Sequence, residues 1–182
     1  MFTSTAVRKL IESGDIGWLG ALRGDGILLR LGSPLQAMTS VPTVDLGDQT
    51  SIDQLYEPPR PDWRHTDLRP GGLLLCRVDE PLRLGSGHAG VIGTLSHLAR
   101  VGLATHVTSP WVLPGWDGYL TLELHNVGPA VLRLHQGMPV ARLLLFAMHG
   151  IPSTASAHPF YGATEHLGSR YAAEFPTDTY AR

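Results

Sequence analysis

Turn-forming residues recur at short intervals through most of this sequence, which contains 21 glycines and 14 prolines among 182 residues. They separate short apolar runs and leave too little uninterrupted chain for long helices, so many short strands joined by turns are favoured. The strand-like runs are residues 27–31, 72–78, 88–92, 102–107, 119–125, 130–134 and 139–147. This arrangement predicts an all-β (mainly β) fold of the sandwich or jelly-roll kind.

The N-terminal residues have a different pattern. Residues 3–13 carry apolar side chains at helical spacing, Thr3 or Ser4 is placed to cap the first turn, and Gly14 follows the last. These signals predict a short amphipathic helix.

Two further segments lack a regular pattern. Residues 45–70 contain three closely spaced prolines and predict a long irregular connection. The residues from Ile151 onward are small and polar, and predict a tail that is disordered or becomes ordered on ligand binding. We therefore expect one domain over residues 1–182, divided into a helix (1–14), a β core (15–150) and a C-terminal tail (151–182).

Charge and cysteine content argue against several classes of protein. The formal net charge is −2 and no run of like charges occurs, so neither a nucleic-acid groove nor binding to an anionic membrane surface is indicated. No apolar stretch approaches the length of about 18 residues needed to span a membrane, and the first residues lack a signal-peptide core, so we expect a cytoplasmic protein. Cys76 is the single cysteine, which excludes intrachain disulfides and cysteine-rich metal sites.

Glu123 is the first candidate for chemistry. In the run 119–125, leucines alternate with Thr121, Glu123 and His125, so these three side chains share the polar face of a strand. A glutamate in this position is most often a solvated carboxylate, but it becomes a candidate general base where that face lines a pocket. The residues alone leave both interpretations open.

Ser96 and Arg100 are the second candidates, because one helical turn would place both side chains on the same side. Such a turn is either an ordinary surface helix or a place where a water molecule and a phosphate are held.

Other motifs are weak or missing. His97, His106 and His125 have no metal-ligand spacing, and one cysteine cannot supply the Pro-Cys-x-x-Cys of zinc-dependent deaminases. We therefore predict no metal-ligating residue and no zinc site. The phosphate-binding glycine motifs of nucleotide-binding α/β proteins are absent as well.

Several motifs together carry a family resemblance. Residues 95–123 form an ungapped block that contains Leu-Ala-Arg-Val-Gly-Leu (98–103), His-Val-Thr (106–108) and Pro-Gly-Trp (114–116). Leu-Gly-Ser-Arg-Tyr (167–171) follows in the tail. With these motifs the chain resembles the dCTP deaminase family, within the dUTPase-like trimeric nucleotide enzymes. The resemblance covers most of the chain and implies a dUTPase-like distorted jelly roll, or β-clip, with a short N-terminal helix and a C-terminal lid.

The resemblance also implies roles for individual residues. Glu123 takes the position of the general base, and Ser96, Arg100 and the backbone carbonyl of Ser109 take the positions that hold the attacking water. The implied reaction is deamination at C4 of a cytosine ring, at sites between neighbouring chains of a homotrimer, with Mg²⁺ accompanying the substrate phosphates. The implied nucleotide-binding positions are Leu95, Ser96, His97, Arg100, Leu113, Thr121, Leu122, Glu123, Arg170, Tyr171 and Glu174.

The sequence departs from the family pattern at three places. Leu95-Ser96-His97 stands where the family usually has Arg-Ser-Ser, which removes a guanidinium and a hydroxyl from the phosphate site. Leu113 stands at an aspartate position ten residues before the general base, and a leucine cannot activate water for attack on a phosphate. Glu174 replaces a polar amide of the lid.

The function predicted from these residues is metal-independent deamination of a cytosine nucleotide, with dCTP yielding dUTP and ammonia as the leading substrate and another cytosine nucleotide as a variant. The alternative is a non-catalytic nucleotide-binding or regulatory protein of the same fold. A dUTPase ranks third, because Leu113 leaves it without its base.

Overall fold

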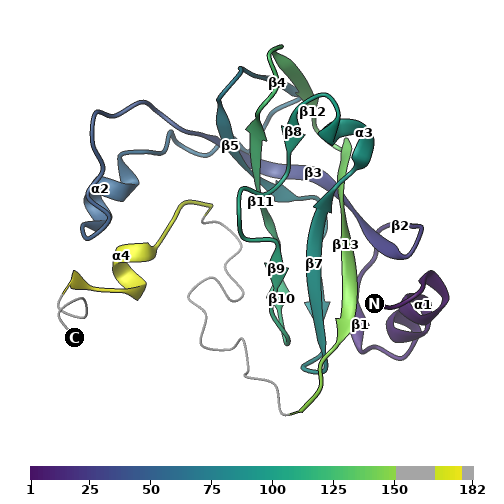
Figure 1. The fold of residues 1–182 in the computed structure, drawn as a ribbon. Coiled ribbons are helices and arrows are strands. Elements are labelled where there is room, and N and C mark those ends of the chain that lie inside the picture. The colour runs from purple at the N-terminus through teal and green to yellow at the C-terminus, as the bar shows by residue number, and fades with distance from the viewer. Residues whose placement is uncertain (151–166, 178–182) are drawn as a thin grey trace.

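The computed structural model describes residues 1–150 and 167–177, and its largest unit is an antiparallel sheet of eight strands (Figure 1). Along this sheet the order is β8-β11-β5-β3-β13-β7-β9, and β2 pairs with β3. Two small sheets, β1-β6-β10 and β4-β12, complete the β structure. The strands are β1 (Ile16–Gly17), β2 (Leu22–Arg23), β3 (Gly26–Ala37), β4 (His65–Leu68), β5 (Leu73–Val78), β6 (Leu82–Leu84), β7 (His88–Thr94), β8 (Leu103–Ala104), β9 (Trp111–Val112), β10 (Asp117–Gly118), β11 (Thr121–Asn126), β12 (Leu132–His135) and β13 (Pro139–Ala147). The helices are α1 (Ser4–Glu12), α2 (Gln49–Asp53), α3 (Ser96–Ala99) and α4 (Tyr171–Glu174). The predicted mainly β class is confirmed.

The long strand β3 curls the main sheet. Its first half pairs with β13 through residues 27–30, and its second half pairs with β5 through residues 31–37, with a register shift between Leu31 and Leu35. A shift of this kind bends a strand and increases its twist. The two halves of the sheet therefore turn toward each other, with β5 and β11 on one side and β13, β7 and β9 on the other.

The alternation predicted for residues 119–125 is confirmed. Leu122 and Leu124 of β11 are buried, whereas Thr121, Glu123 and His125 are only partly covered. The buried face joins an aliphatic core that includes Leu29, Cys76 and Leu143. The opposite face of β11 is thereby left to form the floor of a cavity.

The N-terminal helix is also confirmed. Thr3 is the N-cap of α1, and its Oγ1 accepts a hydrogen bond from the backbone N–H of Ala6 at 3.4 Å. Gly14 follows the helix with φ of 81°, a conformation that glycine adopts without strain.

The predictions for two other segments are wrong in detail. Residues 45–70 contain α2 and β4 rather than only irregular chain. Asp48 caps α2 by accepting the backbone N–H of Thr50, and Ile52 is buried. The run 102–107 pairs only at β8, because the chain then leaves the sheet to form the loop before β9.

The predicted C-terminal tail lies partly outside the described residues, which exclude 151–166 and 178–182. Residues 167–177 are described and contain the short helix α4. Leu167 and Ala172 are buried, so this part of the tail packs against the rest of the molecule.

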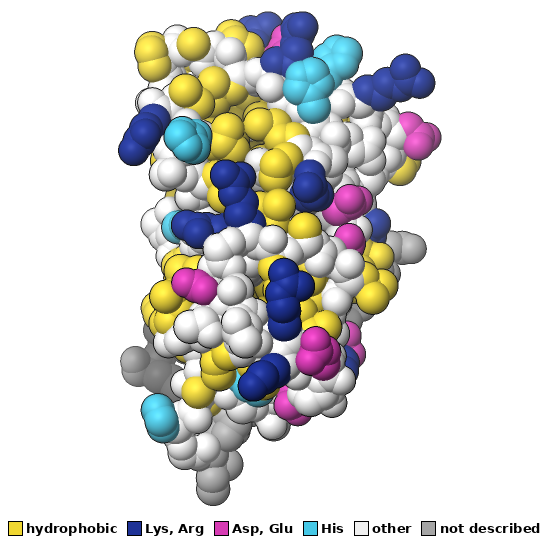
Figure 2. Space-filling view, turned by 90° about the vertical axis from the view of Figure 1, so that its right-hand side faces the viewer, with side chains coloured by type: hydrophobic (Ala, Val, Ile, Leu, Met, Phe, Trp, Pro, Cys, Tyr) yellow, Lys and Arg dark blue, Asp and Glu magenta, His cyan; other side chains and the backbone are white. Residues whose placement is uncertain are grey.

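The surface on the α1 and β13 side has no continuous basic region. Figure 2 shows basic and acidic side chains scattered over this face among polar and apolar ones. Within the described residues, no helix is long and apolar enough to cross a membrane.

Asn126 is a buried polar residue that joins the end of β4 to the connection between β11 and β12. Its side-chain amide donates to the carbonyls of Leu68 and Ala130 at 2.9 and 2.7 Å, and its Oδ1 accepts the backbone N–H of Gly128 at 3.0 Å. The β11–β12 connection is thus fixed next to Gly102, whose positive φ and close approach to Gly128 leave no room for a Cβ atom.

We expect Asn126→Ala to lower the free energy of unfolding by roughly 2–4 kcal/mol, because one buried and two partly buried backbone groups lose their partner. Urea denaturation measures the change. Val127→Ala is the matched control, since Val127 is 67% exposed and its loss should change stability by less than about 0.5 kcal/mol. Equal stabilities for the two variants would contradict this account of the turn.

Candidate active site

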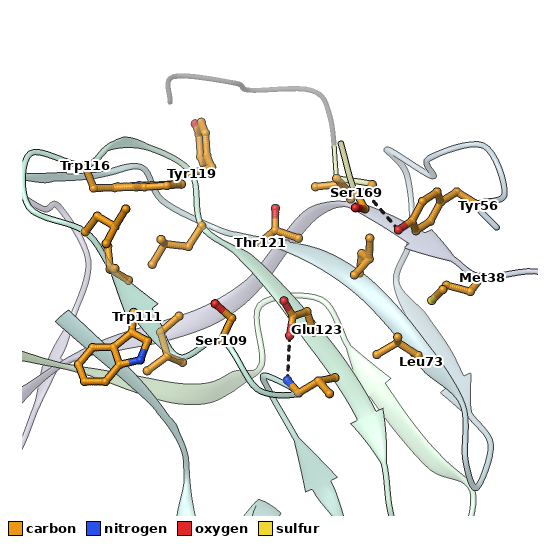
Figure 3. A pocket seen from close by; sticks show the side chains of 18 residues that line it. Met38, Tyr56, Leu73, Ser109, Trp111, Trp116, Tyr119, Thr121, Glu123 and Ser169 are labelled. Carbon is orange, nitrogen blue, oxygen red and sulfur yellow. Dashed lines mark hydrogen bonds between the residues drawn. The ribbon is translucent and has the colours of Figure 1, made fainter. Parts of the chain in front are cut away.

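A cavity of about 790 Å³ opens on the outer face of β11. Its floor is formed by β11 and β5, one wall by β9 and the loop to Tyr119, and another by Tyr56 and the C-terminal residues 167–169 (Figure 3). The lining residues are Met38, Tyr56, Leu73, Leu75, Ile92, Val107, Ser109, Trp111, Val112, Leu113, Trp116, Tyr119, Leu120, Thr121, Glu123, Leu167, Gly168 and Ser169. The volume is suited to a nucleotide-sized molecule.

Glu123 lies in the middle of this cavity. Its Oε2 accepts a hydrogen bond from the backbone N–H of Val107 at 2.8 Å (Figure 3). Leu75 lies directly opposite Glu123 on β5, so the side chain next to the carboxylate across the strands is apolar. The backbone thus fixes one carboxylate oxygen, while the side chain as a whole faces the cavity.

The loop that supplies this N–H is itself held to β7. The hydroxyls of Thr94 and the fully buried Thr105 are 2.8 Å apart, and the backbone N–H of Thr105 donates to Thr94 Oγ1 at 3.1 Å. These bonds fix the chain two residues before Val107, so they set where the Glu123 carboxylate is held.

Polar groups gather in the centre of the cavity and aromatic groups at its ends. Ser109 and Thr121 lie near Glu123, Trp111 and Trp116 lie on one side, and Tyr56 lies on the other (Figure 3). A planar base could stack on such aromatic surfaces while its polar edge faces the carboxylate.

Two aromatic rings that line the cavity, those of Trp116 and Tyr119, are held by further contacts. The Nε1–H of Trp116 donates to the carbonyl of Gly118 at 3.2 Å. The Arg77 guanidinium lies 4.1 Å from the centroid of the Tyr119 ring, a cation–π geometry.

The charge within the cavity is negative. Glu123 is the only charged side chain among the described residues that line it. These residues therefore offer an anionic ligand no cationic side chain.

Ser96 and Arg100 do not line the cavity. The predicted helical turn is confirmed as α3, with Arg100 at its C-cap. Leu98 packs against the core, while Ser96, His97 and Arg100 are exposed. Leu95 precedes the helix and is partly buried. In one chain, two of the predicted water-holding residues, Ser96 and Arg100, are therefore not assembled with Glu123.

Four other predicted positions lie at or beside the cavity. Ser109, Leu113 and Thr121 line it. Leu122 lies on the opposite face of β11 and is 1% exposed, so only its backbone is available to a ligand there.

The predicted tail residues lie on the solvent-exposed side of residues 167–177. Arg170, Tyr171 and Glu174 are exposed and do not line the cavity, whereas their neighbours Leu167, Gly168 and Ser169 do.

Cys76 is not available as a nucleophile. It is fully buried, and burial raises the pKa of its thiol to about 12, so the thiol stays protonated at neutral pH. No three His, Cys, Asp or Glu side chains within residues 1–150 and 167–177 are grouped as metal ligands.

Several cavity residues were missed by sequence reasoning. Tyr56 and Met38 reach the cavity from the segment after β3, Trp111 from β9, and Tyr119 from the connection between β10 and β11. Tyr56 and Met38 have no neighbour in the sequence among the predicted site residues, because only the curl of the sheet brings them to β11. Trp111 and Tyr119 lie within the block 95–123, so their place in the sequence was the one available signal.

A comparison with protein families decides the relationship. A model described as dCTP deaminase-like matches residues 1–148. The chain belongs to the dCTP deaminase-like family. A dCTP deaminase, dUMP-forming, of Corynebacterium glutamicum (strain R) is 30% identical over 170 residues, which cover 91% of this chain and 87% of that protein.

Other members of the dCTP deaminase-like family match over shorter spans. A dCTP deaminase, dUMP-forming, of Acidothermus cellulolyticus is 39% identical over 104 residues, or 57% of this chain and 51% of that protein. The crystal structure of 2'-deoxycytidine 5'-triphosphate deaminase from Agrobacterium tumefaciens superposes with a TM-score of 0.63 at 18% identity, covering 81% of this chain and 48% of that one. The chain thus spans about half the length of these two proteins, and the structural match supports the fold.

The cavity aromatics predict a fluorescence signal for dCTP binding. Trp111 and Trp116 line the cavity, whereas Trp18 is buried in the core. We expect dCTP with Mg²⁺ to change tryptophan emission, and most of that change to disappear in the Trp111→Phe/Trp116→Phe double variant, because a ligand alters only the indoles that it contacts. Trp18→Phe, the matched control, should retain the change. An undiminished change in the double variant would place the ligand elsewhere.

Proposed function

We propose that this protein deaminates a cytosine nucleotide by hydrolysis, with dCTP as the leading substrate and dUTP and ammonia as the products. The observation that carries the proposal is the Glu123 carboxylate, held by the Val107 N–H in a cavity where the other described lining residues are uncharged. A positioned carboxylate next to aromatic and apolar surfaces can act as a general base on a bound base ring.

The proposed reaction proceeds in two stages. Glu123 removes a proton from a water molecule while the water oxygen attacks C4, and the proton is passed to N3 of the ring. In the tetrahedral intermediate, the proton of the new C4 hydroxyl is transferred by way of Glu123 to the amino group. The C4–N bond then breaks and ammonia leaves, which restores the Glu123 carboxylate and gives the uracil ring.

The water and the phosphates require groups that one chain does not bring to this cavity. Ser96 and Arg100 are exposed on α3 and lie outside the cavity, and no cation lines it in the described part of the chain. Trp111 is 67% exposed and Leu113 is 43% exposed at the cavity wall, so an apolar surface is open there. These facts support a homotrimer in which α3 of one copy completes the cavity of the next.

The donor set also fits the way Mg²⁺ would be used. Mg²⁺ binds few protein carboxylates and is often carried by substrate phosphates. The single cavity carboxylate, Glu123, already accepts the Val107 N–H, so the ion would be held by the phosphates of the nucleotide rather than by a protein cage. There it would neutralise phosphate charge.

Leu113 supports a reaction that ends at dUTP. The two relatives described above are named as dUMP-forming, and release of the monophosphate needs a second hydrolysis at a phosphate. Leu113 lines the cavity where the family resemblance has an aspartate for that step, and its side chain has no group that can activate water.

A second candidate function is nucleotide binding without turnover. The changes at Leu95, His97 and Leu113 favour it, because each alters a position implied in nucleotide binding. Glu123, Ser96 and Arg100 favour deamination, because a protein that only binds a nucleotide has no need of a general base beside the ring.

Replacing Glu123 by Gln separates these functions. The amide is nearly isosteric but cannot accept the proton, so we expect ammonia release from dCTP to fall at least about 100-fold. Binding of dCTP, followed by thermal shift, should change little. Glu12→Gln, on the exposed face of α1, is the control and should keep full activity. Turnover that survives Glu123→Gln would exclude the mechanism.

A subunit-mixing experiment tests the shared site. Ser96→Ala and Glu123→Gln trimers should each be nearly inactive. When they are mixed and exchanged in equal amounts, about a quarter of the sites would combine an intact Glu123 with an intact Ser96 from the neighbouring copy. Ammonia release should therefore rise well above the sum of the separate variants. No rise after confirmed exchange, or a monomer in solution, would contradict the shared site.

A further inference from the structure

The C-terminal residues 167–169 form part of the cavity wall although they come from the far end of the described chain. They lie beside the segment that contains α2, which also contributes Tyr56 to the cavity (Figure 3). The question is what holds this wall in place.

Both backbone groups of Ser169 are bonded to side chains of the α2 segment. The carbonyl of Ser169 accepts the Nε2–H of Gln49 at 2.8 Å, and its N–H donates to the hydroxyl of Tyr56 at 3.1 Å. Tyr56 therefore accepts a hydrogen bond from the peptide unit before Ser169, and Gln49 donates one to the peptide unit after it.

Gln49 is itself oriented for this contact. Its Nε2 also donates to Asp53 Oδ1, one helical turn further along α2, at 2.9 Å. The bond to Asp53 already restricts rotation of the Gln49 amide. Less rotational freedom is therefore lost when the same amide binds the Ser169 carbonyl.

Packing reinforces the same contact. A Cβ atom at Gly168 would lie 2.9 Å from a carbon of the Tyr56 ring, so the glycine lets the tail lie flat against that ring. Further along, Thr177 packs against Gly47 so closely that a Cβ at Gly47 would overlap its methyl group. Between them, α4 contacts α2 and buries Ala172.

The α2 segment is in turn joined to the main sheet. Tyr56 and Met38 form a β-bridge, and the backbone N–H of Thr39 donates to the carbonyl of Leu55 at 2.8 Å. Since Met38 follows the end of β3, the position of Tyr56 is set by the strand that curls the sheet.

We infer that Gln49 and Tyr56 are positioning residues that hold Leu167, Gly168 and Ser169 as a wall of the nucleotide cavity. We call this pair of residues the clasp. That the ligand is a nucleotide rests on the proposed function, whereas the contacts that hold the wall do not depend on it. Neither clasp residue reacts, and their effect is on how firmly the nucleotide is enclosed and hence on KM.

Limited trypsin cleavage after Arg170 tests the clasp without any assay of activity. Arg170 is exposed in the docked segment, but a protease needs the surrounding backbone released before it can cut. Where opening is fast compared with cleavage, the rate follows the population of the released segment. We expect Tyr56→Phe and Gln49→Ala each to raise the rate of this cut roughly two- to tenfold, as expected for loss of one hydrogen bond. Cleavage is followed by the mass of the fragment that ends at Arg170.

Two controls separate release of the tail from general loosening. Gln54→Ala alters an exposed residue beside α2 that makes none of the tail contacts described above, and it should be cleaved at the wild-type rate. The urea midpoint of both clasp variants should stay close to wild type. Cleavage of the clasp variants at the wild-type rate would overturn the inference, as would a rise that Gln54→Ala shares.

The kinetic readout distinguishes failure of the clasp from failure of the proposed activity. With dCTP, the clasp variants should raise KM several-fold and leave kcat near its wild-type value, because they remove enclosure and not the general base. A fall in kcat at unchanged KM would overturn the positioning role. If no turnover is found in any variant, dCTP binding followed by fluorescence takes the place of KM, and unchanged binding would overturn the inference.

Discussion

The bend in β3 is the feature on which the rest of this structure depends. One strand pairs with β13 in its first half and with β5 in its second, across a register shift between Leu31 and Leu35. The two halves of the sheet therefore face each other, and the loop that leads to β9 comes to lie beside β11. That approach brings the Val107 N–H to the Glu123 carboxylate. Met38 directly follows β3 and forms a β-bridge with Tyr56, so the other wall of the cavity is positioned by the same strand.

Charge supports the proposal that the cavity of one chain is incomplete. Among the described lining residues Glu123 is the only charged one, and a carboxylate repels a polyphosphate, so under the proposed function the attraction comes from cations placed elsewhere. Within this chain Arg100 lies on α3, outside the cavity, next to Ser96. Because Glu123 and Arg100 are separated in one chain, the proposed site would form only when copies of the chain associate. Each of the two side chains is then held by its own local structure, Glu123 by β11 and Arg100 by α3.

The local features of the fold could be predicted from the sequence, and the nonlocal ones could not. The alternation of leucines around Glu123 and the Thr3 cap of α1 are set by neighbouring residues, and both are confirmed. The helix α2 was missed because it is only five residues long, and β4 because it is a strand only through its pairing with the distant β12. For the site, Glu123 was recognised from its strand and from a family resemblance, and the structure places it in a cavity. Tyr56 and Gln49 had no such signal, since their roles arise only from contacts with residues more than a hundred positions away.

The central claim is that the Glu123 cavity removes an amino group from a cytosine ring and leaves the phosphates intact. Incubation of the wild-type protein with dCTP and Mg²⁺, with ammonia, pyrophosphate and the nucleotide product each measured, tests it most directly. The account predicts one ammonia for each dUTP formed and no release of pyrophosphate. Formation of dUMP with pyrophosphate would contradict the role assigned to Leu113. Absence of ammonia from dCTP, CTP, dCMP, CMP and 5-substituted cytosine nucleotides alike would contradict the deaminase assignment itself.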